Sequence, residues 1–143
     1  MYSCVVVGTD GSQTADKAVE VAAELAREWK AAFHAVTAFR SGTRGLGAAS
    51  GADLVGGGGV LARDAAEEVA QRAADKAGLG AGAHAHAVDK PPADAILATA
   101  EAVNADVVVV GSKGMRGAGR VLGSVPNSVA HGASCAVLIV KTD

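Results

Sequence analysis

Residues Asp106 to Val125 read Asp-Val-Val-Val-Val-Gly-Ser-Lys-Gly-Met-Arg-Gly-Ala-Gly-Arg-Val-Leu-Gly-Ser-Val, and this stretch decides the fold. The four valines after Asp106 form an unbroken apolar run, which is typical of a strand buried on both faces of a parallel sheet. A glycine-rich loop follows the strand. Beyond the loop, Ser124 is a favourable N-cap residue, and Pro126 suits the first turn of a helix. The stretch therefore predicts a strand, a loop and a helix in succession.

The glycine-rich loop has the composition of a phosphate-binding segment. Glycine allows positive φ and lets a ligand approach the backbone amides without meeting a Cβ atom. The glycines of the loop are Gly111, Gly114, Gly117, Gly119 and Gly123, and its cations are Lys113, Arg116 and Arg120. Outward-pointing amides near Gly123 to Val125 would add an anion site at the helix start. A mobile surface loop that is glycine-rich without any ligand is the alternative interpretation of the same composition.

The rest of the chain predicts an α/β fold. Apolar, β-branched runs alternate with segments of helical periodicity. Expected strands are 3–9, 33–39, 83–88, 106–110 and 136–140, and expected helices are 14–29, 61–77, 90–103 and 125–131. We expect Ala62 to be among the inward-facing residues of the second helix and Gly78 to end it. This order predicts one five-stranded, mostly parallel open sheet, Rossmann-like with strand order 3-2-1-4-5 and helices on both faces.

The length of 143 residues suits one domain, 1–143. Within this domain, 41–59 is rich in glycine, alanine and serine and is expected to be a flexible loop. The run Gly56 to Gly59 lacks the Lys-Ser or Lys-Thr ending of a P-loop, so we assign it no phosphate role.

The composition argues against several classes of partner. Aromatic residues make up 3% of the chain and the formal net charge is −2, whereas proteins that bind single-stranded nucleic acid usually combine aromatic platforms with positive charge. No signal peptide and no run of membrane-spanning length is visible, so we expect a soluble, cytoplasmic protein. In a reducing compartment Cys4 and Cys135 are expected to be buried, unreactive thiols.

Two histidines in the third expected strand have the spacing of possible metal ligands. His84 and His86 are two residues apart, so they share one face of the strand and could both reach one ion. No acidic residue or cysteine nearby in the sequence completes a ligand set. We therefore expect them to face solvent on a half-buried or edge strand, and we predict no metal site.

The predicted topology brings two polar segments together. Ligands of open α/β sheets bind at the carboxyl ends of strands where the winding direction reverses, here between the first and fourth strands. One side of that crevice is Thr9-Asp10-Gly11-Ser12, which suits a ribose hydroxyl, an amino group or a metal. The other side is Gly111 to Gly114 with Gly123-Ser124, which suits phosphates. Such a crevice fits a nucleotide better than a sugar, a lipid or a peptide.

At this point the chain resembles the universal stress proteins. Nucleotide-binding members carry glycine, two residues, glycine, nine residues, then glycine and serine or threonine after the fourth strand, and Gly111, Gly114, Gly123 and Ser124 match those positions. The opening 5–12, the segment 92–97 and the closing 137–140 also resemble the family. Two features depart from its pattern, because only eight residues separate Gly114 from Gly123 and Lys90 stands where relatives often have glycine.

The resemblance implies a homodimeric stress-response protein that binds ATP or another adenine nucleotide, including cyclic AMP, with Mg²⁺ as an ion that could accompany ATP. It implies that Thr9 and Asp10 lie beside the adenine and ribose, with Thr37 and Val110 near the base. The residues implied to hold ribose and phosphates are Gly111, Lys113, Gly114, Arg116, Gly123, Ser124 and Val125. It also implies a dimer formed through Ala136 to Lys141, and pairing would cover an otherwise exposed apolar edge.

Three functions remain open from the sequence. The first is a regulatory nucleotide-binding module with little or no turnover. The second is a slow ATP hydrolase or phosphoryl-transfer enzyme, in which Asp10 would act on a metal or water and Lys113 or Arg116 on phosphate charge. No P-loop, kinase signature or paired carboxylate supports this second function, and we assign no catalytic residue. The third is a dimeric interaction protein with an empty site.

Overall fold

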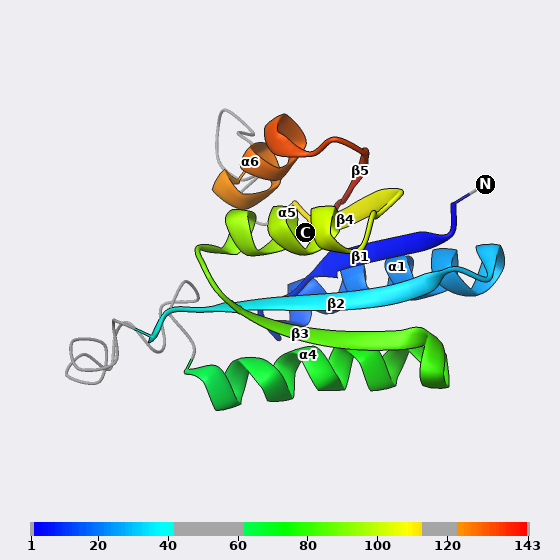
Figure 1. The fold of residues 1–143 in the computed structure, drawn as a ribbon, viewed down its shortest axis with the longest axis horizontal. Coiled ribbons are helices and arrows are strands. Elements are labelled where there is room, and N and C mark those ends of the chain that lie inside the picture. The colour runs from blue at the N-terminus through cyan, green and yellow to red at the C-terminus, as the bar shows by residue number, and fades with distance from the viewer. Residues whose placement is uncertain (1, 42–61, 113–122, 143) are drawn as a thin grey trace.

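The computed structural model describes residues 2–41, 62–112 and 123–142. They form one five-stranded sheet in the order β3-β2-β1-β4-β5, and each neighbouring pair is parallel (Figure 1). The strands are β1 (Cys4–Gly8), β2 (Ala32–Phe39), β3 (Ala83–Asp89), β4 (Val107–Gly111) and β5 (Ala136–Val140). The helices are α1 (Gln13–Trp29), α4 (Arg63–Ala77), α5 (Pro92–Ala102) and α6 (Ser124–Gly132), with a short 3₁₀ turn at Gly80–Gly82. The predicted fold class and strand order are confirmed.

Helices cover both faces of the sheet. Figure 1 shows α1 and α4 on one face and α5 and α6 on the other. Odd-numbered residues of β1, such as Val5 and Val7, pack with the alanines of α1 and α4. Val6 points to the opposite face and packs with Ile96 of α5 and Val129 of α6. The continuous valine runs of β1 and β4 therefore exist because both faces of these strands are buried.

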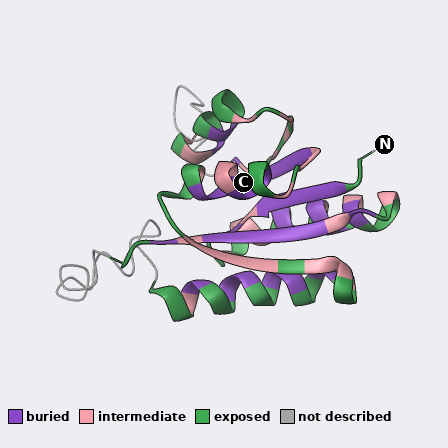
Figure 2. Ribbon diagram, viewed as in Figure 1, coloured by how far each residue is buried: buried purple, intermediate pink, exposed green. Residues whose placement is uncertain are grey.

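The core is made mainly of small side chains. Alanines of α1 and α4 contribute much of the cluster on their face, which allows the two helices to lie close to the sheet. Figure 2 shows the central strands almost wholly buried, while exposed residues line the outer sides of the helices. The edge strand β3 is mostly of intermediate burial.

Helix ends follow local chemistry. The helix α4 ends at Gly78, which adopts φ 69°, as its predicted role of C-terminal stop requires. Its first residue is Arg63, so Ala62 precedes the helix as its N-cap and is exposed. The expectation that Ala62 faces inward was wrong, because the helical pattern does not extend to it. Leu61, and 42–59 of the expected loop, lie outside the described residues.

The two cysteines are free thiols. Cys4 is buried, as expected, whereas Cys135 is only half-buried, so the expectation of burial was wrong for Cys135. Burial is the main cause that raises the pKa of both thiols, with a smaller contribution from the Asp106 carboxylate. Raised pKa values keep the thiols protonated at neutral pH, which fits the unreactive role expected for them.

Within the described residues, no helix is both long and apolar enough to cross a membrane.

Candidate functional site

The turn after β1 is held by its own side chains. Thr9 is buried, its backbone N–H donates to the carbonyl of Val36 (3.0 Å), and its Oγ1 accepts from the N–H of Gly11 (3.1 Å). Asp10 is exposed, and its Oδ1 accepts from the N–H of Ser12 (2.9 Å). Gly11 has φ 81°, a conformation that a side chain would strain. These bonds fix the Asp10 carboxylate at the carboxyl end of β1.

Ser12 links this turn to α1. It is the N-cap residue of the helix, and its Oγ accepts from the N–H of Ala15 (3.2 Å). The capping role of Ser12 was not predicted from the sequence. The signal was present, because a serine directly before the first residue of helical periodicity is a common helix start.

The carboxyl ends of β1 and β4 lie side by side, as the predicted crevice requires. Val7 pairs in register with Val109, so Gly8 and Val110 occupy the next positions along the two strands. A Cβ atom built on Gly8 would lie 3.9 Å from Cγ1 of Val110. The turn at Thr9 and Asp10 follows β1, and the segment after Gly111 follows β4. These two segments therefore leave the sheet from neighbouring positions at the carboxyl ends of the strands.

Gly111, at the end of β4, packs closely against the C-terminal segment. Its φ is not positive, and a Cβ at this position would lie 3.0 Å from Cγ2 of Thr142. The next residue, Ser112, is buried; its N–H donates to the carbonyl of Val140 (2.8 Å) and its Oγ accepts from the N–H of Thr142 (3.1 Å). The absence of a side chain at Gly111 thus makes room for the C-terminal segment. No sequence signal pointed to Ser112 and Thr142, because they are thirty residues apart.

The start of α6 differs from the prediction by one residue. Gly123 is the N-cap, with extended backbone angles (φ −60°, ψ 161°), and Ser124 is the first helical residue. The N-cap is a glycine without a side chain, so the prediction of Ser124 as the N-cap was wrong. Ser124 is exposed and Val125 packs against the apolar cluster beneath α5 and α6. Within the described residues, the N-cap residue therefore supplies no side-chain bond to the first-turn amides of α6.

Three of the predicted site residues lie outside the described residues: Lys113, Gly114 and Arg116. The shortened spacing between Gly114 and Gly123 falls there as well. The described part of the site therefore consists of the turn after β1, the ends of β2 and β4, and the start of α6.

Thr37, near the end of β2, carries an unusual buried hydroxyl. The residue is 1% exposed, and its Oγ1 has no hydrogen-bond partner among the described residues. Gly8 pairs with Val36, so Thr37 lies one position further along, at the level of Thr9. A buried hydroxyl without a partner costs about 1–3 kcal/mol. Such a group at a strand end is a candidate for bonding to a ligand.

Charged residues collect where β2 and β3 end. The carboxylate of Asp89 accepts from the N–H (3.1 Å) and the hydroxyl (2.6 Å) of Ser41, and these bonds lower its pKa. Arg63, at the start of α4, places its guanidinium 4.7 Å from the ring centre of Phe39. Arg40 and Arg63 also act on Asp89 electrostatically. Like the turn after β1, this cluster lies at the carboxyl ends of the strands, and it was not predicted from the sequence.

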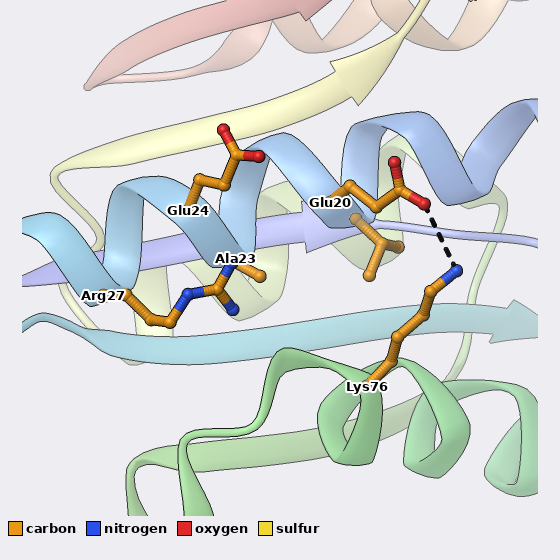
Figure 3. A pocket seen from close by; sticks show the side chains of 6 residues that line it. Glu20, Ala23, Glu24, Arg27 and Lys76 are labelled. Atoms are coloured by element: carbon orange, nitrogen blue, oxygen red, sulfur yellow. Dashed lines mark ion pairs between the residues drawn. The ribbon is translucent and has the colours of Figure 1, made fainter.

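A separate pocket lies between α1 and α4 (Figure 3). Lys76 reaches across it and pairs with Glu20 (3.5 Å) and with Asp16 (3.5 Å). Arg27 donates to the carbonyl of Ala77 (2.7 Å). Both cations are thus engaged within the protein, and we assign this pocket no ligand.

Comparisons with known proteins agree with this architecture. The model of the universal stress protein family matches residues 1–141. A universal stress protein of Methanocaldococcus jannaschii is 31% identical over 144 residues, which cover 99% of this chain and 83% of that protein. The crystal structure of a universal stress protein in complex with cAMP has a TM-score of 0.71 and 32% identity, and the match covers 99% of this chain and 98% of that chain.

A second solved structure has the same fold. It is the universal stress protein from Archaeoglobus fulgidus in complex with dAMP, with a TM-score of 0.68 and 24% identity, and the match covers 98% of each chain. Because the family model extends over nearly the whole sequence and relatives above 30% identity cover it end to end, this chain belongs to the universal stress protein family.

Proposed function

We propose that this protein binds an adenine nucleotide at the carboxyl ends of β1 and β4 and acts as a regulatory stress-response protein with little or no turnover. The observation that carries the proposal is the close approach of these two strand ends, at the point where the sheet reverses its winding direction. The relative solved with cAMP has the same fold and is 32% identical. The relative solved with dAMP also holds an adenine nucleotide.

Each described residue has a proposed part in this site. Thr9 and Asp10 contact the ribose and the base, with Thr37 and Val110 beside the base. The buried, unpartnered hydroxyl of Thr37 supports this placement, because a base edge would supply its missing hydrogen-bond partner. Gly111, Gly123, Ser124 and Val125 form the phosphate end with Lys113, Gly114 and Arg116, and the amides at the start of α6 point to an anion.

We propose ATP, accompanied by Mg²⁺, as the preferred ligand and cyclic AMP as the alternative. The net charge of the loop supports a polyphosphate, since Lys113, Arg116 and Arg120 are all within ten residues of Gly111. The protein is proposed to act in the cytoplasm as one domain. We also propose that two copies pair through β5, which forms one edge of the sheet and exposes Leu138.

The proposal is tested by calorimetry with ATP, cyclic AMP and GTP, and by native mass spectrometry of the freshly purified protein. Asp10→Asn removes the charge but keeps an oxygen that can accept from Ser12, so the turn should persist. We expect it to weaken adenine-nucleotide binding by about tenfold, which corresponds to about 1.4 kcal/mol. Glu101→Gln removes a comparable exposed carboxylate at the C-terminal end of α5 and should leave affinity unchanged.

Two results would contradict this proposal. Absence of adenine-nucleotide binding by the wild-type protein would favour the interaction protein with an empty site. Steady ATP hydrolysis that is lost in Asp10→Asn would favour the enzyme instead.

A further inference from the structure

Three of the four histidines of this chain come together on one face of the sheet. His34 lies in β2, and His84 and His86 lie in β3. The strand register pairs His34 with His84 and places His86 opposite Val36. Val36 and Val88 both contribute to the apolar cluster under α5 and α6, so alternation along the two strands puts all three imidazoles on that face. The fold thus supplies from β2 the third histidine that the sequence around β3 lacked.

The three rings are in direct contact. Nδ1 of His34 lies 2.9 Å from Nε2 of His86, so one ring donates its N–H and the other accepts. The ring of His34 also stacks on that of His84, with centroids 4.6 Å apart, and its centroid is 5.1 Å from that of His86. The expectation that His86 simply faces solvent was therefore wrong, because the pairing of β2 with β3 gives it a polar partner.

The rings are held in the form that binds metals. Burial is the main cause that lowers the pKa of His34, to about 4, and the neighbouring His86 and His84 lower it further. Burial and His84 lower the pKa of His86 as well. Both imidazoles are therefore neutral at pH 7, and a neutral imidazole nitrogen is a good ligand for zinc and copper.

The cluster can be reached from solvent. Among the strands that the structure describes, β3 pairs with β2 alone and so forms an edge of the sheet. His34 is 9% exposed, whereas His86 is half-buried and His84 is exposed. Figure 2 shows this gradient, with β2 almost wholly buried and β3 largely of intermediate burial. An ion could approach from the solvent side of β3 without displacing a helix.

We propose that His34 and His86 bind a divalent transition-metal ion, Zn²⁺ or Cu²⁺, through Nδ1 and Nε2 respectively, with His84 as a third ligand. Two nitrogens on a tetrahedral zinc ion with bonds of about 2.0–2.1 Å lie roughly 3.3 Å apart, so the two nitrogens have to separate by a few tenths of an ångström and the rings have to tilt until both lone pairs point at the ion. The ring that donates in the pair moves its proton to its other nitrogen, so binding releases no proton. Water completes the coordination.

The third ligand needs a rearrangement. Among the residues that the structure describes, no group of three or more histidine, cysteine or acidic side chains is already arranged to hold a metal ion. His84 is stacked on His34, so its ring must rotate before a nitrogen can face the ion. Because His84 is exposed, few packing contacts oppose that rotation. The competing interpretation is a hydrogen-bonded histidine pair that only joins β2 to β3.

The test is calorimetric titration of the full chain with ZnCl₂ and with CuCl₂, in the absence of nucleotide because phosphates bind these ions. We expect one ion per chain. His86→Gln keeps a polar side chain but removes the imidazole, and it should weaken binding by about tenfold or more; His84→Ala should weaken it several-fold. His131→Ala is the matched control, because His131 lies at the end of α6, outside the cluster, and is exposed. This control should bind like the wild type.

A second measurement avoids replacing the buried His34. In NMR spectra of the imidazole nitrogens, Zn²⁺ should shift the signals of His34 and His86 and leave those of His131 unchanged. Equal metal affinity in wild type and His86→Gln would overturn the proposal, as would loss of binding in His131→Ala. If the ring signals of His34 and His86 stay unchanged at saturating Zn²⁺, the two histidines bind no metal and their hydrogen bond only joins β2 to β3.

Discussion

At the scale of single residues, the site contains groups whose neighbours decide their roles. Gly111 is predicted from the sequence to face a ligand, and its missing side chain also makes room for Thr142. Thr37 looks like an ordinary β-branched strand residue, yet its hydroxyl is buried without a partner among the described residues. Neither feature can be predicted from nearby residues of the sequence, because both arise from strand packing and from contacts with the C-terminal segment.

Replacement of Thr37 by valine should reveal the cost of this hydroxyl. Valine has the same shape but no polar atom, so we expect Thr37→Val to raise the free energy of unfolding of the nucleotide-free protein by about 1 kcal/mol. If the hydroxyl bonds to the nucleotide, the same variant should bind it several-fold more weakly. Urea denaturation and calorimetry measure the two effects.

A matched control for this substitution is Thr99→Val. Thr99 is also buried, but its hydroxyl donates to the carbonyl of Ala95 (2.9 Å). Loss of that bond should lower the free energy of unfolding by about 0.5–1.5 kcal/mol. If both variants are destabilised equally, the hydroxyl of Thr37 has a partner in solution and our interpretation of it is wrong.

At the scale of elements, the strands were easier to predict than the ends of the helices. Unbroken valine runs identify β1 and β4 because strands buried on both faces need apolar side chains at each position. The α6 start was misplaced by one residue, since both Gly123 and Ser124 can cap a helix and the choice depends on backbone angles set by the packing of α6. The hydrogen bond between His34 and His86 was missed for a similar reason, because it depends on the register of β2 against β3, which is a property of the whole sheet.

Ser12, the N-cap of α1, and Ser124, the first residue of α6, allow a capping serine and a non-capping serine to be compared directly. The hydroxyl of Ser12 accepts from the N–H of Ala15, whereas the side chain of Ser124 caps nothing. We expect Ser12→Ala to lower the free energy of unfolding by about 1 kcal/mol, within the usual range for a lost N-cap. Ser124→Ala should change it by less than about 0.5 kcal/mol. Thermal or urea unfolding of the nucleotide-free variants measures both, and a larger loss in Ser124→Ala would contradict the observed helix start.

At the scale of the whole molecule, the sheet has two edges of different character. The edge strand β3 carries the histidine cluster and lies beside α4. The other edge, β5, is apolar throughout its sequence Ala-Val-Leu-Ile-Val, and each of its residues is at least partly exposed. An apolar edge strand with unpaired backbone groups favours association with another chain. The proposed homodimer would satisfy those groups by pairing two copies of β5.

This proposal predicts that a charge in the middle of β5 breaks the dimer. Leu138 is 38% exposed, so a lysine there can reach solvent in a monomer but would place two like charges close together when two β5 strands pair. We expect Leu138→Lys to convert the protein to a monomer in light-scattering or native mass measurements, with its circular dichroism unchanged. His84→Lys places the same charge at an exposed position on the opposite edge strand and should remain dimeric. A monomeric wild type, or loss of the dimer in His84→Lys with retention in Leu138→Lys, would exclude β5 as the pairing edge.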